Sequence, residues 1–139
     1  MTSNLYELSQ SFMFDAAHTL TRAVPLVEFE PSRRIHGHTY TTKVTVRGVK
    51  GADGMLEFFR LPKNKRESVD LFYLRKALDE VRELLDHRFL DEVDGLGPAT
   101  MENLCDFIYR QLAPKFPVSR VTVGRASGDE CTLHAKEAA

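Results

Sequence analysis

The sequence has few cysteines, no tryptophan and no excess of charge of either sign. Cys105 and Cys131 are the only two cysteines in 139 residues. They are too few and too isolated for a disulfide framework, so we expect a reducing compartment. The net charge is −1 and the basic residues are scattered. The sequence therefore gives no sign of the basic patch that nucleic acid or an anionic membrane would require.

Long hydrophobic runs and internal repeats are also missing. No apolar run approaches membrane-spanning length, and the N-terminal "MTSNLYELSQ" lacks the charged-then-apolar order of a signal peptide. The length fits a single domain, residues 1–139, and the chain is 42% hydrophobic and 28% charged, as globular proteins are. We therefore expect a cytoplasmic protein with no membrane contact.

Hydrophobic periodicity predicts four strands and two helices. Alternating or β-forming residues predict strands at 5–17, 38–48, 116–127 and 131–135. Apolar residues spaced by three and four predict helices over 69–90, capped by Ser68 or Asp70, and over 100–112, capped by Thr100. Segments 19–34 and 61–68 are expected to be loops, the second of them exposed. The order β, β, α, α, β, β indicates an α+β fold with a mostly antiparallel sheet.

A sheet of this size has two open edges. Natural proteins protect such edges by closing the sheet or by pairing it with another chain. We therefore expect a homo-oligomer joined through its sheet edges, although the pattern alone does not set the number of subunits.

Two histidines stand one residue apart in "RRIHGHTY". Five histidines in 139 residues give about 0.2 such pairs by chance. Residues i and i+2 of a strand project from the same face, so His36 and His38 can each give a nitrogen to one metal. His18 ends the first predicted strand and is a candidate third ligand, with small Ala16 and Ala17 allowing close approach. The alternative is that these are ordinary strand histidines, half-exposed or satisfied in the core.

An aspartate precedes another histidine at the end of the first predicted helix. A carboxylate beside an imidazole can fix its tautomer and raise its basicity, as acid/base histidines require. The alternative is that His87 only complements the negative C-terminus of the helix. The Asp86–His87 pair alone favours this second interpretation.

Taken in order, five motifs resemble the 6-pyruvoyltetrahydropterin synthase / 6-carboxytetrahydropterin synthase family. They are "FMFDAAH", "RRIHGHTY", "LLDHRFL", "GPATMENL" and "VTVGRAS". The resemblance that they carry extends over nearly the whole chain. The resemblance implies the tunnelling fold: a four-stranded antiparallel sheet with two helices on one face, whose sheets join into an oligomeric barrel, commonly a hexamer. Relative to the family, the chain has extra residues around "EFFRLPKNKRES".

The resemblance also implies a site. It makes His18, His36 and His38 zinc ligands and matches Asp86 and His87 to the family's acid/base pair. Family members act on 7,8-dihydroneopterin triphosphate. Zinc polarises the side-chain oxygens of that substrate, while a cysteine base and the Asp–His pair move protons.

Two positions depart from the family pattern. The family's catalytic cysteine lies four residues before the first histidine of H-G-H, where this chain has Ser32, and an alcohol is a far weaker acid than a thiol. The family's V-x-V-x-E-T glutamate, which anchors the pterin edge, aligns with Arg125, which can only donate hydrogen bonds. Glu130 or Asp129 is a candidate replacement anchor, and Cys131 is a candidate thiol.

Further residues are candidates for substrate binding. The family's T-x-E-N motif, kept here with Thr100, lines the pterin pocket, and Met101 replaces its usual small polar residue. Arg33 and Arg34 flank the histidine motif and can receive phosphate or carboxylate, or simply be solvated.

The sequence thus supports two hypotheses. The first is a zinc-dependent lyase acting on a pterin-like substrate, with activity altered by the Ser32 and Arg125 departures. The second is a non-catalytic protein that binds a pterin- or purine-like ligand on the same scaffold. A purely structural assembly protein has little support.

Overall fold

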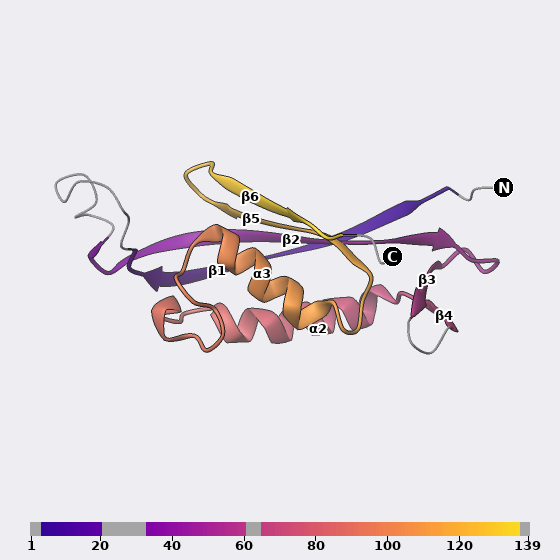
Figure 1. Ribbon diagram of the computed structural model, residues 1–139, viewed down its shortest axis with the longest axis horizontal. Coiled ribbons are helices and arrows are strands. Elements are labelled where there is room, and N and C mark those ends of the chain that lie inside the picture. Colours follow the sequence, from indigo (N-terminus) through magenta and orange to yellow (C-terminus); the bar gives the residue numbers. More distant parts are fainter. Residues whose placement is uncertain (1–3, 21–32, 61–64, 137–139) are drawn as a thin grey trace.

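The computed structural model describes residues 4–20, 33–60 and 65–136. One twisted sheet carries two α-helices on a single face (Figure 1). In chain order, the elements are β1 (Tyr6–His18), β2 (His36–Lys50), β3 (Leu56–Arg60), β4 (Lys65–Ser68), α2 (Leu71–Leu85), the short 3₁₀ helix η1 (Leu90–Glu92), α3 (Met101–Leu112), β5 (Val118–Arg125) and β6 (Glu130–His134). This is the predicted α+β tunnelling fold, with two extra short strands.

The long strand β2 organises the sheet. It pairs antiparallel with β1 along one edge, from Tyr6 opposite Gly48 to His18 opposite His36. It pairs antiparallel with β5 along the other edge, and β5 pairs with β6. Strand β3 joins β2 at Val49 and Lys50, just beyond the point where β1 begins. Within the described residues, the outer edge of β6 has no partner strand.

The core lies between the sheet and the two helices. Alternate residues of β1 and β2 face the helices, so Phe14, Tyr40 and Val44 are almost fully buried. Helix α2 contributes its three-and-four-spaced stripe, including Leu74 and Leu78, to the same core. At about 25 cal/mol per Å² of apolar surface removed from water, this burial is the main stabilising contribution.

Both helices begin with a side-chain cap, as the sequence predicts. Of the two candidates for α2, the structure selects Asp70, whose carboxylate accepts from the Phe72 N–H at 2.8 Å. Thr100 accepts from the Asn103 N–H at 3.1 Å and so caps α3.

The prediction of an exposed loop over 61–68 is wrong for Lys65–Ser68, which forms β4 and pairs with β3; residues 61–64 lie outside the described part. The four residues of β4 are all polar, so no apolar alternation marks the strand. Its contacts include backbone pairing with β3 and an ion pair between Arg66 and Glu57 at 3.5 Å. A short strand with only polar residues, such as β4, gives no signal to hydrophobic periodicity.

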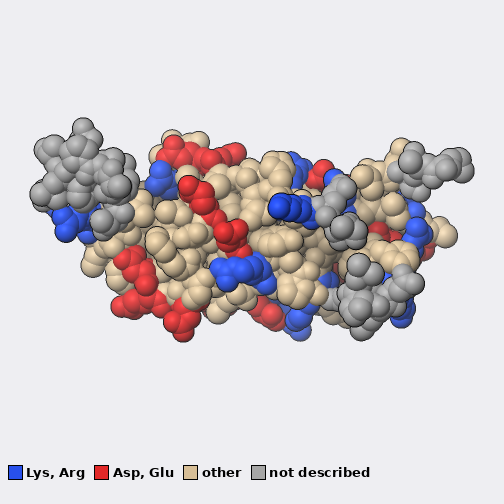
Figure 2. All heavy atoms as spheres, viewed as in Figure 1, with Lys and Arg blue, Asp and Glu red and all other residues tan. Residues whose placement is uncertain are grey.

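Surface charge is mixed. Acidic and basic side chains are interspersed over the face shown in Figure 2, where the described residues form no continuous basic stripe. Within the described ranges, no helix is both long and apolar enough to cross a membrane.

Candidate functional site

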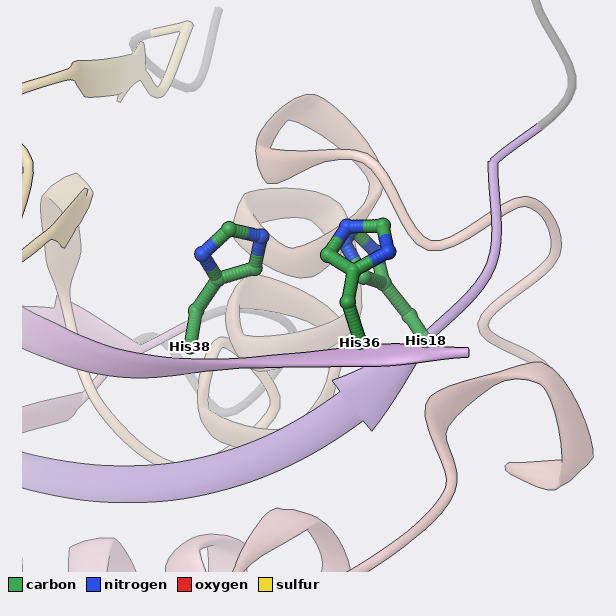
Figure 3. Close-up of side chains that lie close together, drawn as sticks. All are labelled: His18, His36 and His38. Carbon is green, nitrogen blue, oxygen red and sulfur yellow. The ribbon is translucent and has the colours of Figure 1, made fainter. Parts of the chain in front are cut away.

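Three imidazole rings meet where β1 ends and β2 begins (Figure 3). The ring centroids of His18 and His36 lie 4.5 Å apart, and each lies 5.0 Å from that of His38. Each ring offers one nitrogen, and these atoms all lie within 4.8 Å of one another. We call His18, His36 and His38 the three-histidine cluster.

Strand alternation builds the cluster as the sequence predicts. His18 is directly opposite His36 in the β1–β2 register, and His38 follows two residues later on the same face of β2. Gly37 between them faces the other way, and a Cβ there would sit 3.4 Å from the Ala16 carbonyl oxygen. Small residues therefore let the two strands pair closely beneath the rings.

Hydrogen bonds fix the orientation of two rings. His18 Nδ1 lies 2.8 Å from the Ala99 carbonyl oxygen, and His36 Nδ1 lies 2.8 Å from that of Arg34. Because a carbonyl can only accept, each Nδ1 must donate, which leaves the Nε2 lone pair available. In the described part of the chain, the buried Nε2 atoms of His18 and His38 have no hydrogen-bond partner.

Burial and nearby charge disfavour the protonated forms of His18 and His38. Burial lowers the pKa of His18, and the hydrogen bond to the Ala99 carbonyl only partly opposes this. Burial also lowers the pKa of His38, and the positive charge of Arg125 lowers it further. Imidazoles with buried nitrogens that lack a hydrogen-bond partner are what a divalent transition metal binds, so the donor set fits zinc with one coordination position open.

Around the cluster lies a second layer of side chains. The Tyr40 ring sits 5.6 Å from that of His38 and stacks on Phe14 at 4.9 Å, and burial raises the pKa of Tyr40 to about 12. Arg125 is directly opposite Tyr40 in the β2–β5 register, so its side chain shares the face of the cluster. It pairs with the Asp129 carboxylate, which also accepts from the Ser127 hydroxyl. These two hydrogen bonds hold the pKa of Asp129 below its usual value, and the bond from Arg125 has the larger effect.

A second group of polar side chains lies along the outer edge of β1, the edge away from β2. The Asp15 N–H donates to Asp86 Oδ1 at 3.0 Å, and the His87 N–H donates to the Asp15 carbonyl at 2.7 Å. Arg82 pairs with the other oxygen of Asp86 at 3.1 Å. Asp86 Oδ1 is 3.9 Å from His87 Nε2. The hydrogen bond from Asp15 and the charge of Arg82 hold the pKa of Asp86 low.

His87 is unusual in its backbone and its exposure. Its φ of 57° makes it the one described non-glycine residue with positive φ, a conformation that costs a residue with a Cβ about 1–2 kcal/mol. Its side chain is 80% exposed and lines an open cavity of about 530 Å³ together with Asp15, Gly37 and Thr39. In the strand register, Asp15 and Thr39 share the sheet face opposite the cluster. The same cavity is also lined by His38 of the cluster, so His87 stands at the edge of β1 with residues of both faces around it.

Sequence comparison assigns the family. Residues 7–136 match the model of the family described as 6-pyruvoyl tetrahydropterin synthase. The chain belongs to this family. It is also 30% identical, over 104 residues, to the dihydroneopterin monophosphate aldolase of Pyrococcus furiosus, covering 75% of this chain and 72% of that protein.

Solved structures of tetrahydropterin synthases share the fold. That of the Caenorhabditis elegans 6-pyruvoyl tetrahydropterin synthase aligns with a TM-score of 0.75 at 22% identity, covering 98% of this chain and 99% of the other. That of the Plasmodium vivax 6-pyruvoyltetrahydropterin synthase aligns with a TM-score of 0.67 at 19% identity, covering 97% and 100%. At these identities the likeness establishes the architecture, and the chemistry must be argued from the residues of this chain.

The other residues that the sequence analysis named as candidates are spread over several parts of the fold. Thr100 caps α3 one residue after the carbonyl that holds His18, and Met101 packs against the core at the same helix end. Glu130 pairs with Gly124 in the β5–β6 register, so it shares the face opposite the cluster. Ser32 lies outside the described residues. Arg33 and Arg34 are exposed.

The candidate thiol does not stand beside the cluster. Cys131 is opposite Val123 and packs against the core. Its carbonyl accepts from the Cys105 thiol at 3.4 Å. Burial and the neighbouring Cys131 raise the pKa of Cys105 to about 12. Neither contact brings a thiolate toward the histidines.

Sequence reasoning missed three contributors. Tyr40 continues the alternation of His36 and His38 on β2, so the period of two could have identified it. The Ala99 carbonyl, which orients His18, is a backbone atom and leaves no signal in the sequence. The Asp15 backbone, which holds both Asp86 and His87, depends on a turn after α2 that no pattern specifies.

Proposed function

We propose that the protein is a zinc-dependent lyase of pterin metabolism that cleaves the side chain of a 7,8-dihydroneopterin phosphate. The observation that carries this proposal is the convergence of three imidazoles, two of them with buried Nε2 atoms that lack a partner among the described residues. The kinship with a dihydroneopterin monophosphate aldolase supports cleavage of a carbon–carbon bond as the reaction.

His18, His36 and His38 would hold the zinc. When bound, zinc would polarise the substrate oxygens next to the pterin ring. The chain's own part is to orient the ligating rings, through the carbonyls of Ala99 and Arg34, and to exclude solvent from the His18 side, which is only 3% exposed.

Asp86 and His87 would move the proton. In a retro-aldol cleavage, His87 takes the proton of the hydroxyl on the departing carbon, and the bond between the two side-chain carbons breaks. The electron pair of the broken bond moves toward the ring imine, which becomes an enamine, and the departing fragment leaves as an aldehyde. His87 then returns the proton to the carbon left on the ring. An ionised Asp86 stabilises the imidazolium in between.

His87 is exposed at the edge of β1, whereas His18 is buried on the helix-covered face of the sheet, so we infer that a neighbouring subunit completes each site. The edge of β6, which has no partner strand among the described residues, and the outer edge of β1 are the surfaces through which sheets would join into a barrel. A homohexamer, the state the resemblance implies, is the proposed assembly. It would set His87 of one subunit against the cluster of another.

The test incubates zinc-loaded protein with three candidate substrates: 7,8-dihydroneopterin, its monophosphate and its triphosphate. The products are separated by chromatography. We expect a one-carbon side chain to remain on the pterin and a two-carbon aldehyde to appear. His134→Ala, at an exposed histidine of β6, is the matched control and should keep full activity.

Absence of product from every substrate, with pterin still bound by the zinc-loaded protein, would contradict the proposal. It would favour the second hypothesis, a non-catalytic pterin-binding protein. A product that has lost triphosphate but keeps its carbon chain would support the lyase class and overturn only the retro-aldol step.

A further inference from the structure

We propose that Arg125 selects the ligand of this site by donating its Nε–H to an anionic oxygen, a carboxylate or a phosphate, of a molecule bound at the three-histidine cluster. The inference rests on the proposed function only in that it places a ligand at the cluster. It names the chemistry that this chain adds at a position where the family carries a glutamate.

The position of Arg125 is fixed by strand pairing. It is opposite Tyr40, which itself follows His38 by two residues on the same face of β2. Its strand neighbours on this face, Val121 and Val123, are fully buried. Arg125 is therefore the next residue on this face beyond the buried valines, beside Tyr40 and close enough to the cluster for its charge to lower the pKa of His38.

One donor of Arg125 is left over. Its Nη2 pairs with Asp129, but its buried Nε has no hydrogen-bond partner in the described part of the chain. A buried donor without an acceptor costs about 1–3 kcal/mol, so a ligand oxygen at this point would recover that cost. The unpartnered Nε2 atoms of His18 and His38 belong to the same end of the same face. Two electron-pair donors for a metal and one hydrogen-bond donor thus stand together.

Asp129 offers a rival interpretation, as a carboxylate anchor for the donor edge of a pterin. Its side chain is 54% exposed, against 28% for that of Arg125. One of its oxygens is already occupied by Arg125 and by the Ser127 hydroxyl at 3.1 Å. The buried and unsatisfied partner is the arginine, so the geometry favours Arg125 as the group that meets the ligand and Asp129 as the group that holds and partly neutralises it.

The two interpretations predict opposite effects of one substitution. If Arg125 receives an anion, Asp129→Asn removes a competing negative charge and strengthens anion binding. If Asp129 is the anchor, Asp129→Asn weakens binding of every pterin. Arg125→Gln should abolish the preference for an anion, because it removes a charge-assisted hydrogen bond.

The experiment is calorimetric titration of the zinc-loaded wild-type protein and variants with pterin-6-carboxylate, with neutral 6-hydroxymethylpterin, and with inorganic phosphate as a pterin-free anion. The matched control is Arg120→Gln, which removes an arginine paired with Glu7 at the far end of the same strand. Zinc content and circular dichroism establish that each variant is folded and loaded. Arg125→Lys keeps the charge without the Nε donor.

We expect wild type and Arg120→Gln to bind pterin-6-carboxylate at least about tenfold more tightly than 6-hydroxymethylpterin, the factor that corresponds to one charged hydrogen bond. Arg125→Gln should bring the ratio to about one, Arg125→Lys should lower it partly, and Asp129→Asn should raise it. Phosphate should follow the carboxylate, and if only one of the two anions responds, it identifies the ligand's charged group.

An unchanged ratio in Arg125→Gln, or weaker binding of both pterins in Asp129→Asn, would overturn the assignment while leaving turnover by the wild-type enzyme intact. If no pterin binds any variant but phosphate affinity falls in Arg125→Gln and not in Arg120→Gln, the role of Arg125 stands and the pterin function falls.

Discussion

The three-histidine cluster and the Asp86–His87 pair lie at the same end of β1, yet they are built in opposite ways. Both groups hold three donor side chains close enough for one ion, the second group including Asp15. In the cluster, buried nitrogens are left without partners among the described residues. In the second group, the oxygens are occupied by the Asp15 N–H, Arg82 and the Thr39 hydroxyl.

In the proposed function, this difference separates a ligand set from a proton carrier. A metal site needs nitrogens that nothing else satisfies, and among the described residues burial provides them at His18 and His38. A proton carrier needs an ionised partner and access to the reacting molecule. The pKa of Asp86 is held low, and the side chain of His87 is 80% exposed. Proximity of histidines and acids alone would not have told the two groups apart.

The largest expected effect comes from removing one imidazole of the three-histidine cluster. His36→Ala should reduce bound zinc from about one ion per chain to almost none, because two remaining imidazoles make an incomplete zinc site. Activity should be lost with the metal. Elemental analysis of protein purified without chelator measures this, with His134→Ala as the control. Retention of one zinc per chain in His36→Ala would remove His36 from the ligand set.

The next largest effect concerns the Asp86–His87 pair. His87→Ala should lower kcat by about 10²–10⁴-fold, the usual contribution of an acid/base group, while zinc content stays unchanged. Measuring metal and turnover on the same sample checks both halves. Loss of zinc in His87→Ala would show that the two groups are one site in the assembled protein.

How much of this could be predicted from the sequence depends on the kind of contact. The pairing of His18 with His36 follows from strand alternation and small neighbours, and the structure confirms it. The caps at Asp70 and Thr100 are equally local. The face on which His87 lies could not be predicted, because it depends on one positive φ and on backbone bonds to Asp15. The β3–β4 hairpin was missed because β4 has only polar residues.

The free energy of unfolding should depend on pH through two histidines of the cluster. Burial lowers the folded-state pKa of His18 and His38 below the ordinary 6.5, so below that pH the unfolded chain binds more protons than the folded one. The free energy of unfolding of zinc-free protein should therefore be highest above about pH 6.5 and fall as the pH drops toward 5.5. Urea unfolding at several pH values measures this. His38→Gln should flatten the slope, and an unchanged slope would place the titration elsewhere.

The smallest effect concerns the strained backbone beside the acid/base pair. His87→Gly and His87→Ala both remove the imidazole, but only glycine adopts a φ of 57° without steric cost. We expect His87→Gly to be more stable than His87→Ala by about 0.5–1 kcal/mol. Thermal unfolding compares them. Equal stability would mean that the positive φ is relaxed in solution.

The central claim is that His18, His36 and His38 bind a single zinc ion through three imidazole nitrogens. X-ray absorption spectroscopy of the zinc-loaded protein tests it directly. The account predicts three imidazole nitrogens at about 2.0–2.1 Å with one oxygen ligand in the open position, and loss of this signature in His36→Ala. A sulfur ligand, or fewer than three imidazoles around the zinc of the wild-type protein, would contradict it.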